Sequence, residues 1–434
     1  MKKLLNYINN HVLVKLASLK MAAVIIRIIG GLLTSKAIAV LIGAEGMALI
    51  GNLRNFTKAF QAITVLGLYE VSVKHIASFK DDLVKLSKTV STIFYVGFMS
   101  TVLLSIFCYF GATLINDIIF PTYNDYAHII RIFAIALPFY ALNMFSFSIM
   151  NGFSKYKTLI IINIIGQILG VSITLLLIYQ NKIEGALVSV VIAEALMFLI
   201  TLIGIINRRS LIPLIKVSRI SWGYLKSMKT YSVMALFSAV ILPLVALAIR
   251  SYIIENVGYK DAGFWEAMTR ISHYYLMLVT ALIALYILPR FTEIETVQEF
   301  KKEVFGFYKT VIPFFAMGLV IIYLLKSFIV PVVFSSEFQP VEALFFWQLL
   351  GDFVKILSLV IAYQFLAKKM FWHYVVTEIF LVIILYLTSI FFIDLYGVEG
   401  AVMGHFVSYL MYFAVILLIF GSSLFGVDVN KNRE

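Results

Sequence analysis

Ile183-Glu184-Gly185-Ala186 opens one apolar run of the chain, and Val398-Glu399-Gly400-Ala401 opens another, 215 positions later. Two further pairs of positions recur at offsets of 217 and 214: Gly46 with Gly263, and Lys155 with Lys369. Three nearly equal offsets indicate an internal repeat of about half the chain. The sequence therefore predicts two homologous halves.

Each half consists of apolar runs long enough to cross a bilayer, which takes about 20 helical residues. The runs are continuous and lack the alternating pattern of a transmembrane β-barrel. An even number of six spans per half gives both halves the same orientation, related by a pseudo-two-fold axis along the membrane normal. We thus expect an all-α polytopic membrane protein with a six-helix lobe at 1–206, a basic cytoplasmic linker at 207–229 and a six-helix lobe at 230–434. The twelve expected spans are 12–41, 46–72, 89–115, 126–152, 158–180, 184–206, 230–256, 262–289, 310–333, 341–367, 371–394 and 398–425.

The composition excludes most soluble classes of protein. Of the 434 residues, 62% are hydrophobic and 13% are charged, whereas soluble domains average about 45–50% and about 25%. The formal net charge of +12 would suggest a nucleic-acid partner on a soluble domain, but membrane proteins concentrate Lys and Arg in cytoplasmic loops. We therefore expect no nucleic-acid partner.

The distribution of basic residues predicts the orientation. With the N-terminus in the cytoplasm, 22 of the 35 Lys and Arg residues fall in cytoplasmic segments and 10 fall within spans. The external side holds 3, namely Lys182, Lys260 and Lys326, the last at the outer end of the span 310–333. By the positive-inside rule, both termini are expected in the cytoplasm. The chain is expected to be a multi-pass protein of the cytoplasmic membrane.

The chain lacks the usual signatures of catalysis. It contains no phosphate loop of the G-x-x-x-x-G-K-[ST] type and no H-E-x-x-H motif, its six histidines lack ligand spacing, and Cys108 is its single cysteine. No catalytic residue, metal site or cofactor is predicted. Transport is the expected function.

The informative residues are charges inside the spans, where a charge costs about 2.5–3.5 kcal/mol on insertion scales. The spans contain ten basic residues but only four acidic residues away from the span edges. Pairing within the membrane therefore leaves an excess of positive charge. The excess predicts a water-accessible cationic cavity and an anionic substrate. Candidate substrate-binding residues are Arg27, Arg54, Lys58, Arg250, Arg270 and Lys355, and candidate coupling or cavity-paired acids are Asp352, Glu266 and Glu378.

Some of these charges have a purely structural alternative. Glu266 and Arg270 have the i,i+4 spacing of a helix-stabilising ion pair. Asp352 and Lys355 share a helix face and are candidates to neutralise each other. Glu378 also fits a buried, protonated structural carboxylate.

Three motifs resemble the bacterial flippases of lipid-linked oligosaccharides, in the polysaccharide-transporter branch of the multidrug/oligosaccharidyl-lipid/polysaccharide (MOP) superfamily. The resemblance extends over nearly the full length and is greatest to O-antigen translocases and lipid III flippases. It implies the two-lobed MATE-like fold. The motifs are Gly51-Asn52-Leu53-Arg54-Asn55-Phe56 after Gly46, Gly263-Phe264-Trp265-Glu266 followed by Ile271-Ser272, Tyr275 and Leu288-Pro289, and Phe346-Trp347-Gln348-Leu349-Leu350-Gly351-Asp352 with Lys355.

The resemblance implies a bacterial inner-membrane flippase that moves an undecaprenyl-pyrophosphate-linked oligosaccharide to the external leaflet by alternating access. It places Arg54, Arg250, Asp352 and Lys355 on the cavity wall. Expected partners are this substrate and membrane lipids, with a proton or sodium as the coupling ion, polysaccharide polymerase components as candidates, and a monomeric chain. The alternatives are a cation-coupled exporter of small molecules from the same superfamily, a non-transporting scaffold for polysaccharide synthesis, and a membrane-embedded transferase.

Overall fold

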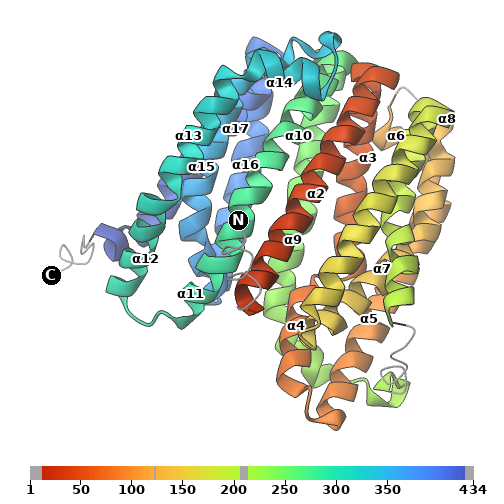
Figure 1. The fold of residues 1–434 in the computed structure, drawn as a ribbon, viewed down its shortest axis with the longest axis vertical. Helices are drawn as coiled ribbons and strands as arrows, with labels where there is room; N and C mark the ends of the chain where they lie inside the picture. Colours follow the sequence, from red (N-terminus) through yellow and green to blue (C-terminus); the bar gives the residue numbers. More distant parts are fainter. Residues whose placement is uncertain (1–11, 122–123, 206–213, 426–434) are drawn as a thin grey trace, which may run out of the picture. The chain divides into compact units, whose positions relative to one another are not determined.

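The computed structural model describes residues 12–121, 124–205 and 214–425, and all regular structure in these ranges is helical (Figure 1). The predicted termini and the first part of the predicted linker lie outside them. The helices are α2 (Val12–Leu41), α3 (Gly43–Thr64), α4 (Leu68–Phe79), α5 (Leu83–Phe110), α6 (Ala112–Ile119), α7 (Ala127–Gly152), α8 (Tyr156–Ile205), α9 (Trp222–Asn256), α10 (Tyr259–Leu282), the π-helical η4 (Ile283–Ile287), α11 (Leu288–Glu293), α12 (Val297–Thr310), α13 (Ile312–Leu324), α14 (Lys326–Val333), α15 (Val341–Ala367), α16 (Phe371–Tyr396) and α17 (Val398–Phe425).

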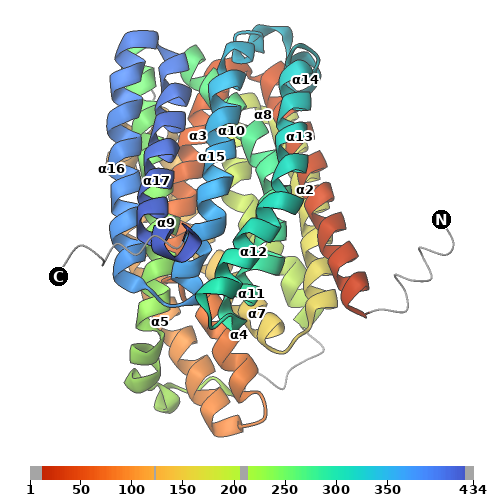
Figure 2. The ribbon, with the colours of Figure 1, turned by 90° about the vertical axis from the view of Figure 1, so that its left-hand side faces the viewer.

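The helices form two compact units. The N-terminal unit comprises Met1–Ile42 and Leu49–Leu244, and the C-terminal unit comprises Gly43–Ala48 and Val245–Glu434. In the N-terminal unit, α7 packs on α8 and on α5, and α8 also packs on α2. In the C-terminal unit, α17 lies beside α16 and α15, as Figure 2 shows, and α10 packs on α15.

Ten helices among the described residues are long and apolar enough to cross a membrane. The chain is therefore an all-helical, multi-pass membrane protein, as predicted. The bounds of α15 and α17 agree with the predicted spans 341–367 and 398–425. The count of twelve crossings in two lobes stays a prediction.

The prediction of one continuous helix over the second span, 46–72, was wrong. This span is divided into α3 and α4, because the backbone at Leu66 and Gly67 has φ values of 49° and 62°. A Cβ added to Gly67 would lie 2.4 Å from the carbonyl oxygen of Ser232, so only glycine allows this approach. The predicted spans 89–115 and 310–333 are also divided, at Gly111 and near Leu325.

The internal repeat is visible in the backbone itself. Six of the eight described residues with positive φ form pairs 215 positions apart, whereas Leu66 and Gly67 have no such counterpart. Each such residue stands between two helices or at a kink. The pairs are Gly43 with Gly258, Ser154 with Lys369, and Lys182 with Gly397.

The motif that opens the sixth and the twelfth predicted spans forms a tight reversal of the chain. At Lys182 the backbone leaves the helical conformation, so α8 is two helices joined at a kink. A Cβ on Gly185 would lie 1.9 Å from the carbonyl oxygen of Leu177, and one on Gly400 would lie 2.0 Å from that of Phe392. Residues eight apart in a straight helix are about 12 Å apart, so the chain doubles back at both places.

Gly400→Ala is expected to destabilise the protein by about 1–3 kcal/mol, because the new methyl group would overlap the backbone of Phe392 and Ile393, and relieving the overlap requires a shift of the main chain. The matched control on the same helix is Gly421→Ala, where no atom lies within 4 Å of an added Cβ. Unfolding midpoints in detergent micelles measure both. Equal midpoints for the two variants would contradict the tight reversal.

Candidate functional site

Three of the predicted substrate-binding residues belong to the N-terminal unit. Arg27 is exposed on α2, Arg54 is half-buried on α3, and Lys58 is exposed one turn further along α3. The fully buried Asn52 fixes this part of α3, because its Nδ2 donates a hydrogen bond to the carbonyl oxygen of Ile119 at 3.0 Å. The polar motif around Arg54 thus anchors its own helix.

The C-terminal unit holds a buried cluster of three charges. The Nη2 atom of Arg250 lies 2.5 Å from Oε2 of Glu266, and Nε of Arg270 lies 2.8 Å from Oε1 of the same carboxylate. The guanidinium of Arg250 also stacks on Trp265, 5.0 Å from its ring centroid. Their relative exposures are 2%, 6% and 5% for Arg250, Glu266 and Arg270. Two positive groups share one negative group in a buried site.

Glycines bring the helices of this cluster together. Gly258, with φ of 140°, joins α9 to α10 and returns the chain, so Glu266 lies beside Arg250 although it is 16 residues later. A Cβ on Gly263 would lie 1.9 Å from the carbonyl oxygen of Ala44. The first turn of α3 therefore packs closely against α10, next to the charged cluster.

A second buried cluster surrounds Asp352, which has a relative exposure of 0%. Its Oδ2 accepts hydrogen bonds from Ser272, from the hydroxyl of Tyr275 at 2.5 Å and from Gln348 Nε2 at 3.1 Å. Its Oδ1 lies 3.0 Å from Nε2 of His405 on α17. The carboxylate is held by four side chains from three helices, α10, α15 and α17.

Lys355 and Glu378 lie near this second cluster. The Nζ atom of Lys355 lies 5.2 Å from the ring centroid of Tyr409. Glu378, on α16, is 9% exposed. The Asp352 oxygens accept hydrogen bonds from the four side chains named above, and the charges of Asp352 and Lys355 also interact electrostatically. The mutual neutralisation of Asp352 and Lys355 stays a prediction.

The predicted charged residues form two clusters in the structure, and these differ from the groups that share a helix face in the sequence. Arg250 joins the Glu266–Arg270 pair to give one cluster, and Asp352 forms the other. His405 and Tyr409 were missed. The available signal was the i, i+4 spacing of these two residues on an otherwise apolar helix.

The fold is similar to that of solved membrane transporters of the MOP superfamily. An inward-facing MATE family multidrug resistance transporter of this superfamily superposes with a TM-score of 0.72 at 12% identity, covering 92% of this chain and 98% of that one. The lipid II flippase MurJ in an inward closed conformation gives a TM-score of 0.69 at 14% identity, covering 94% and 87%.

Residues 39–343 match the family described as polysaccharide biosynthesis protein, and the chain belongs to that family. A curated relative is the lipid III flippase of Escherichia coli (strain K12), which is 26% identical over 403 residues, 92% of this chain and 96% of the relative. The predicted resemblance to this group is confirmed. These relatives are named as transporters, in agreement with the prediction that the chain is not an enzyme.

Proposed function

We propose that this protein is a flippase of the bacterial inner membrane that moves an undecaprenyl-pyrophosphate-linked oligosaccharide from the cytoplasmic to the external leaflet. Transport would proceed by alternating access, with both termini in the cytoplasm. The likeness to a lipid III flippase over nearly the full length supports the class of substrate. The fold shared with MOP transporters supports a mechanism in which two units move against each other.

The observation that carries the proposal is the positive excess of the Arg250–Glu266–Arg270 cluster, buried inside a membrane unit. A neutral or cationic cargo gains nothing from such an excess. A pyrophosphate carries about two negative charges, and guanidinium groups bind such oxygens in bidentate fashion. We propose that Arg250 and Arg270 exchange part of their contact with Glu266 for the pyrophosphate, assisted by Arg27, Arg54, Lys58 and Lys355.

We further propose that protons rather than sodium ions couple transport, through Asp352. Sodium requires free oxygen ligands, whereas both oxygens of Asp352 already accept hydrogen bonds. Asp352 and His405 are two titratable groups in direct contact, and a proton can pass between them. Glu266 is the weaker candidate, because two guanidinium groups stabilise its charged form.

The test is the leaflet orientation of a labelled undecaprenyl-pyrophosphate oligosaccharide in proteoliposomes. Wild-type protein is expected to accelerate flipping over protein-free vesicles, and an imposed proton gradient is expected to increase the rate more than a sodium gradient does. Arg250→Ala and Arg54→Ala are expected to slow flipping about ten- to a hundredfold, since each removes a charge-assisted contact with the headgroup. The matched control is Arg131→Ala, an exposed arginine of α7.

The outcomes separate the competing functions. No flipping above background, with or without a gradient, would contradict the flippase and favour the exporter or the scaffold. Flipping by wild type that is unchanged in Arg250→Ala and Arg54→Ala would keep the function and refute the cationic site.

A further inference from the structure

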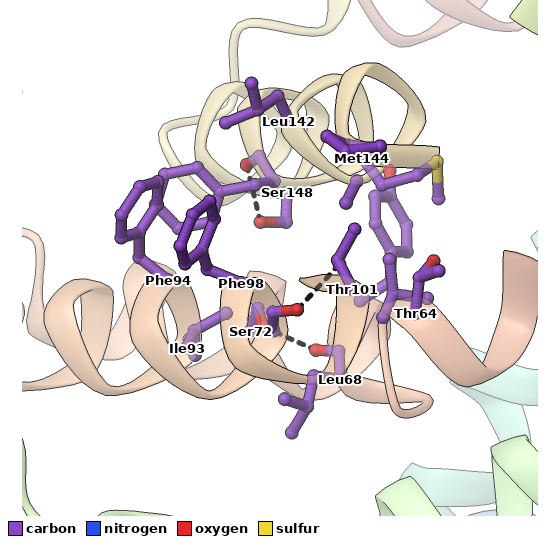
Figure 3. A pocket seen from close by; sticks show the side chains of 16 residues that line it. Thr64, Leu68, Ser72, Ile93, Phe94, Phe98, Thr101, Leu142, Met144 and Ser148 are labelled. Atoms are coloured by element: carbon purple, nitrogen blue, oxygen red, sulfur yellow. Dashed lines mark hydrogen bonds between the residues drawn. The ribbon is translucent and has the colours of Figure 1, made fainter. Parts of the chain in front are cut away.

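A hollow opens inside the N-terminal unit where α4, α5 and α7 meet, at the break between α3 and α4 (Figure 3). It contains about 570 Å³ of space, part of it open to the outside, and none of the sixteen residues that line it is charged. Aromatic and aliphatic side chains form most of its wall. They include Phe94, Phe98, Leu142, Met144 and Phe145.

The serine and threonine hydroxyl groups in the wall already donate hydrogen bonds within the protein, and the Tyr69 hydroxyl accepts one from Asn151 Nδ2 at 3.4 Å. Thr64 donates to the carbonyl oxygen of Gln61 at 2.6 Å, Thr101 to that of Gly97 at 2.7 Å, and Ser148 to that of Phe145 at 2.8 Å. Ser72 donates to the carbonyl oxygen of Leu68 in the same way. These side chains therefore present methyl and methylene surface to the hollow, and the hollow selects an apolar ligand.

The hollow lies beside the middle of α5, a helix long and apolar enough to cross a membrane. Gly97, in its wall, stands 14 residues after Leu83 and 13 before Phe110, the ends of α5. At 1.5 Å per residue, it is about 20 Å from either end of the helix. The headgroup of a lipid at rest in the bilayer stays at the interface, so such a lipid meets this part of α5 with its hydrocarbon chain.

We propose that this hollow binds a segment of the polyisoprenyl chain of the lipid-linked substrate, an inference that rests on the proposed function. A phospholipid acyl chain reaches the middle of the bilayer only with its terminal carbons. A polyprenyl chain is longer and passes the middle of the bilayer with much of its length remaining. The chain then stays attached to the N-terminal unit while the headgroup crosses.

Gly97 provides a way to fill the hollow without disturbing the fold. An added Cβ at this position meets only the carbonyl oxygen of Thr64, at 4.0 Å. Gly97→Leu is therefore expected to place its side chain in the hollow, and leucine is also a better helix former than glycine. The matched control is Gly170→Leu on α8, where no atom lies within 4 Å of an added Cβ.

The experiment is photo-crosslinking of the full-length protein in proteoliposomes, using undecaprenyl phosphate with a diazirine in mid-chain. A phosphatidylethanolamine with a diazirine at the end of one acyl chain is the competing probe. We expect the polyprenyl probe to label peptides of α5 and α7 around the hollow, and Gly97→Leu to reduce this labelling about tenfold while Gly170→Leu does not. We also expect Gly97→Leu to lower the apparent affinity for long-chain substrate in the flipping assay.

The results distinguish this inference from the proposed function. Flipping by wild type without labelling around the hollow would overturn the inference alone. Equal labelling by the phospholipid probe would identify a general lipid site and would also overturn it. Absence of flipping would overturn the proposed function, whereas specific polyprenyl labelling would still establish the chain-binding site. Should Gly97→Leu fail to fold, the position of the wild-type crosslinks decides the question.

Discussion

Glu266→Gln is expected to lower the free energy of unfolding by about 3–5 kcal/mol, whereas Arg250→Gln is expected to cost only about 1 kcal/mol. The asymmetry follows from the ratio of two guanidinium groups to one carboxylate. Removing Glu266 leaves two buried positive charges without the carboxylate that both contact. Removing Arg250 takes away its contact with Glu266 Oε2 and its stacking on Trp265, but it leaves the i,i+4 pair of Glu266 and Arg270 at 2.8 Å, so the carboxylate keeps a cationic partner.

Unfolding titrations of purified protein in mixed micelles measure both variants. Glu255→Gln is the matched control, because Glu255 is an exposed glutamate near the end of α9. The double variant Glu266→Gln/Arg250→Gln removes one charge of each sign and is expected to be more stable than Glu266→Gln alone. Equal stability losses in the two single variants would show that the cluster has no positive excess, and the headgroup site would lose its basis.

The functional consequence separates stability from binding. Arg250→Gln is expected to fold and yet to flip substrate slowly, because the remaining pair is electrically neutral. If Arg250 only held α9 to α10, its substitution would lower the stability and the transport rate of the protein together. Stable folding with slow flipping in Arg250→Gln would assign Arg250 to substrate binding rather than to holding the helices together.

The spans that sequence patterning predicted best are those whose ends have local causes. α15 begins directly after Pro340 and ends before Lys368 and Lys369, and α17 follows Gly397, where the backbone turns. Apolar length and these turn residues determine the bounds without reference to the rest of the chain.

The break between α3 and α4 could not be predicted from local sequence. An isolated glycine within an apolar run is compatible with a continuous helix. The break depends on the approach of Gly67 to the carbonyl oxygen of Ser232, which is 165 residues later. The hollow at this break was hidden from sequence reasoning for the same reason.

The composition of the candidate sites was predicted in part. Glu266 and Arg270 were paired from their spacing, but the partnership with Arg250 depends on the α9–α10 hairpin. His405 joins Asp352 because Gly351 lets α17 approach α15: a Cβ on Gly351 would lie 2.4 Å from the imidazole ring. Helix periodicity gives the face of a residue but not the helix that this face meets.

The second large effect is expected at Asp352, where four donors converge on one carboxylate at a fully buried position. Asp352→Ala is expected to cost about 3–5 kcal/mol of unfolding free energy, because the four donors lose their acceptor where water does not replace it. The matched control is Asp394→Ala on α16, an exposed aspartate that accepts one hydrogen bond, from Tyr252.

Asp352→Asn then reports the state of the histidine. The amide oxygen can keep the bonds from Ser272, Tyr275 and Gln348, and the amide nitrogen then faces Nε2 of His405. A neutral imidazole can accept this bond in its Nδ1–H tautomer, so we expect Asn to cost about 1 kcal/mol at neutral pH. A loss equal to that of Asp352→Ala already at neutral pH would mean that His405 is a permanent cation, which would remove the proton-sharing pair on which the proposed coupling depends.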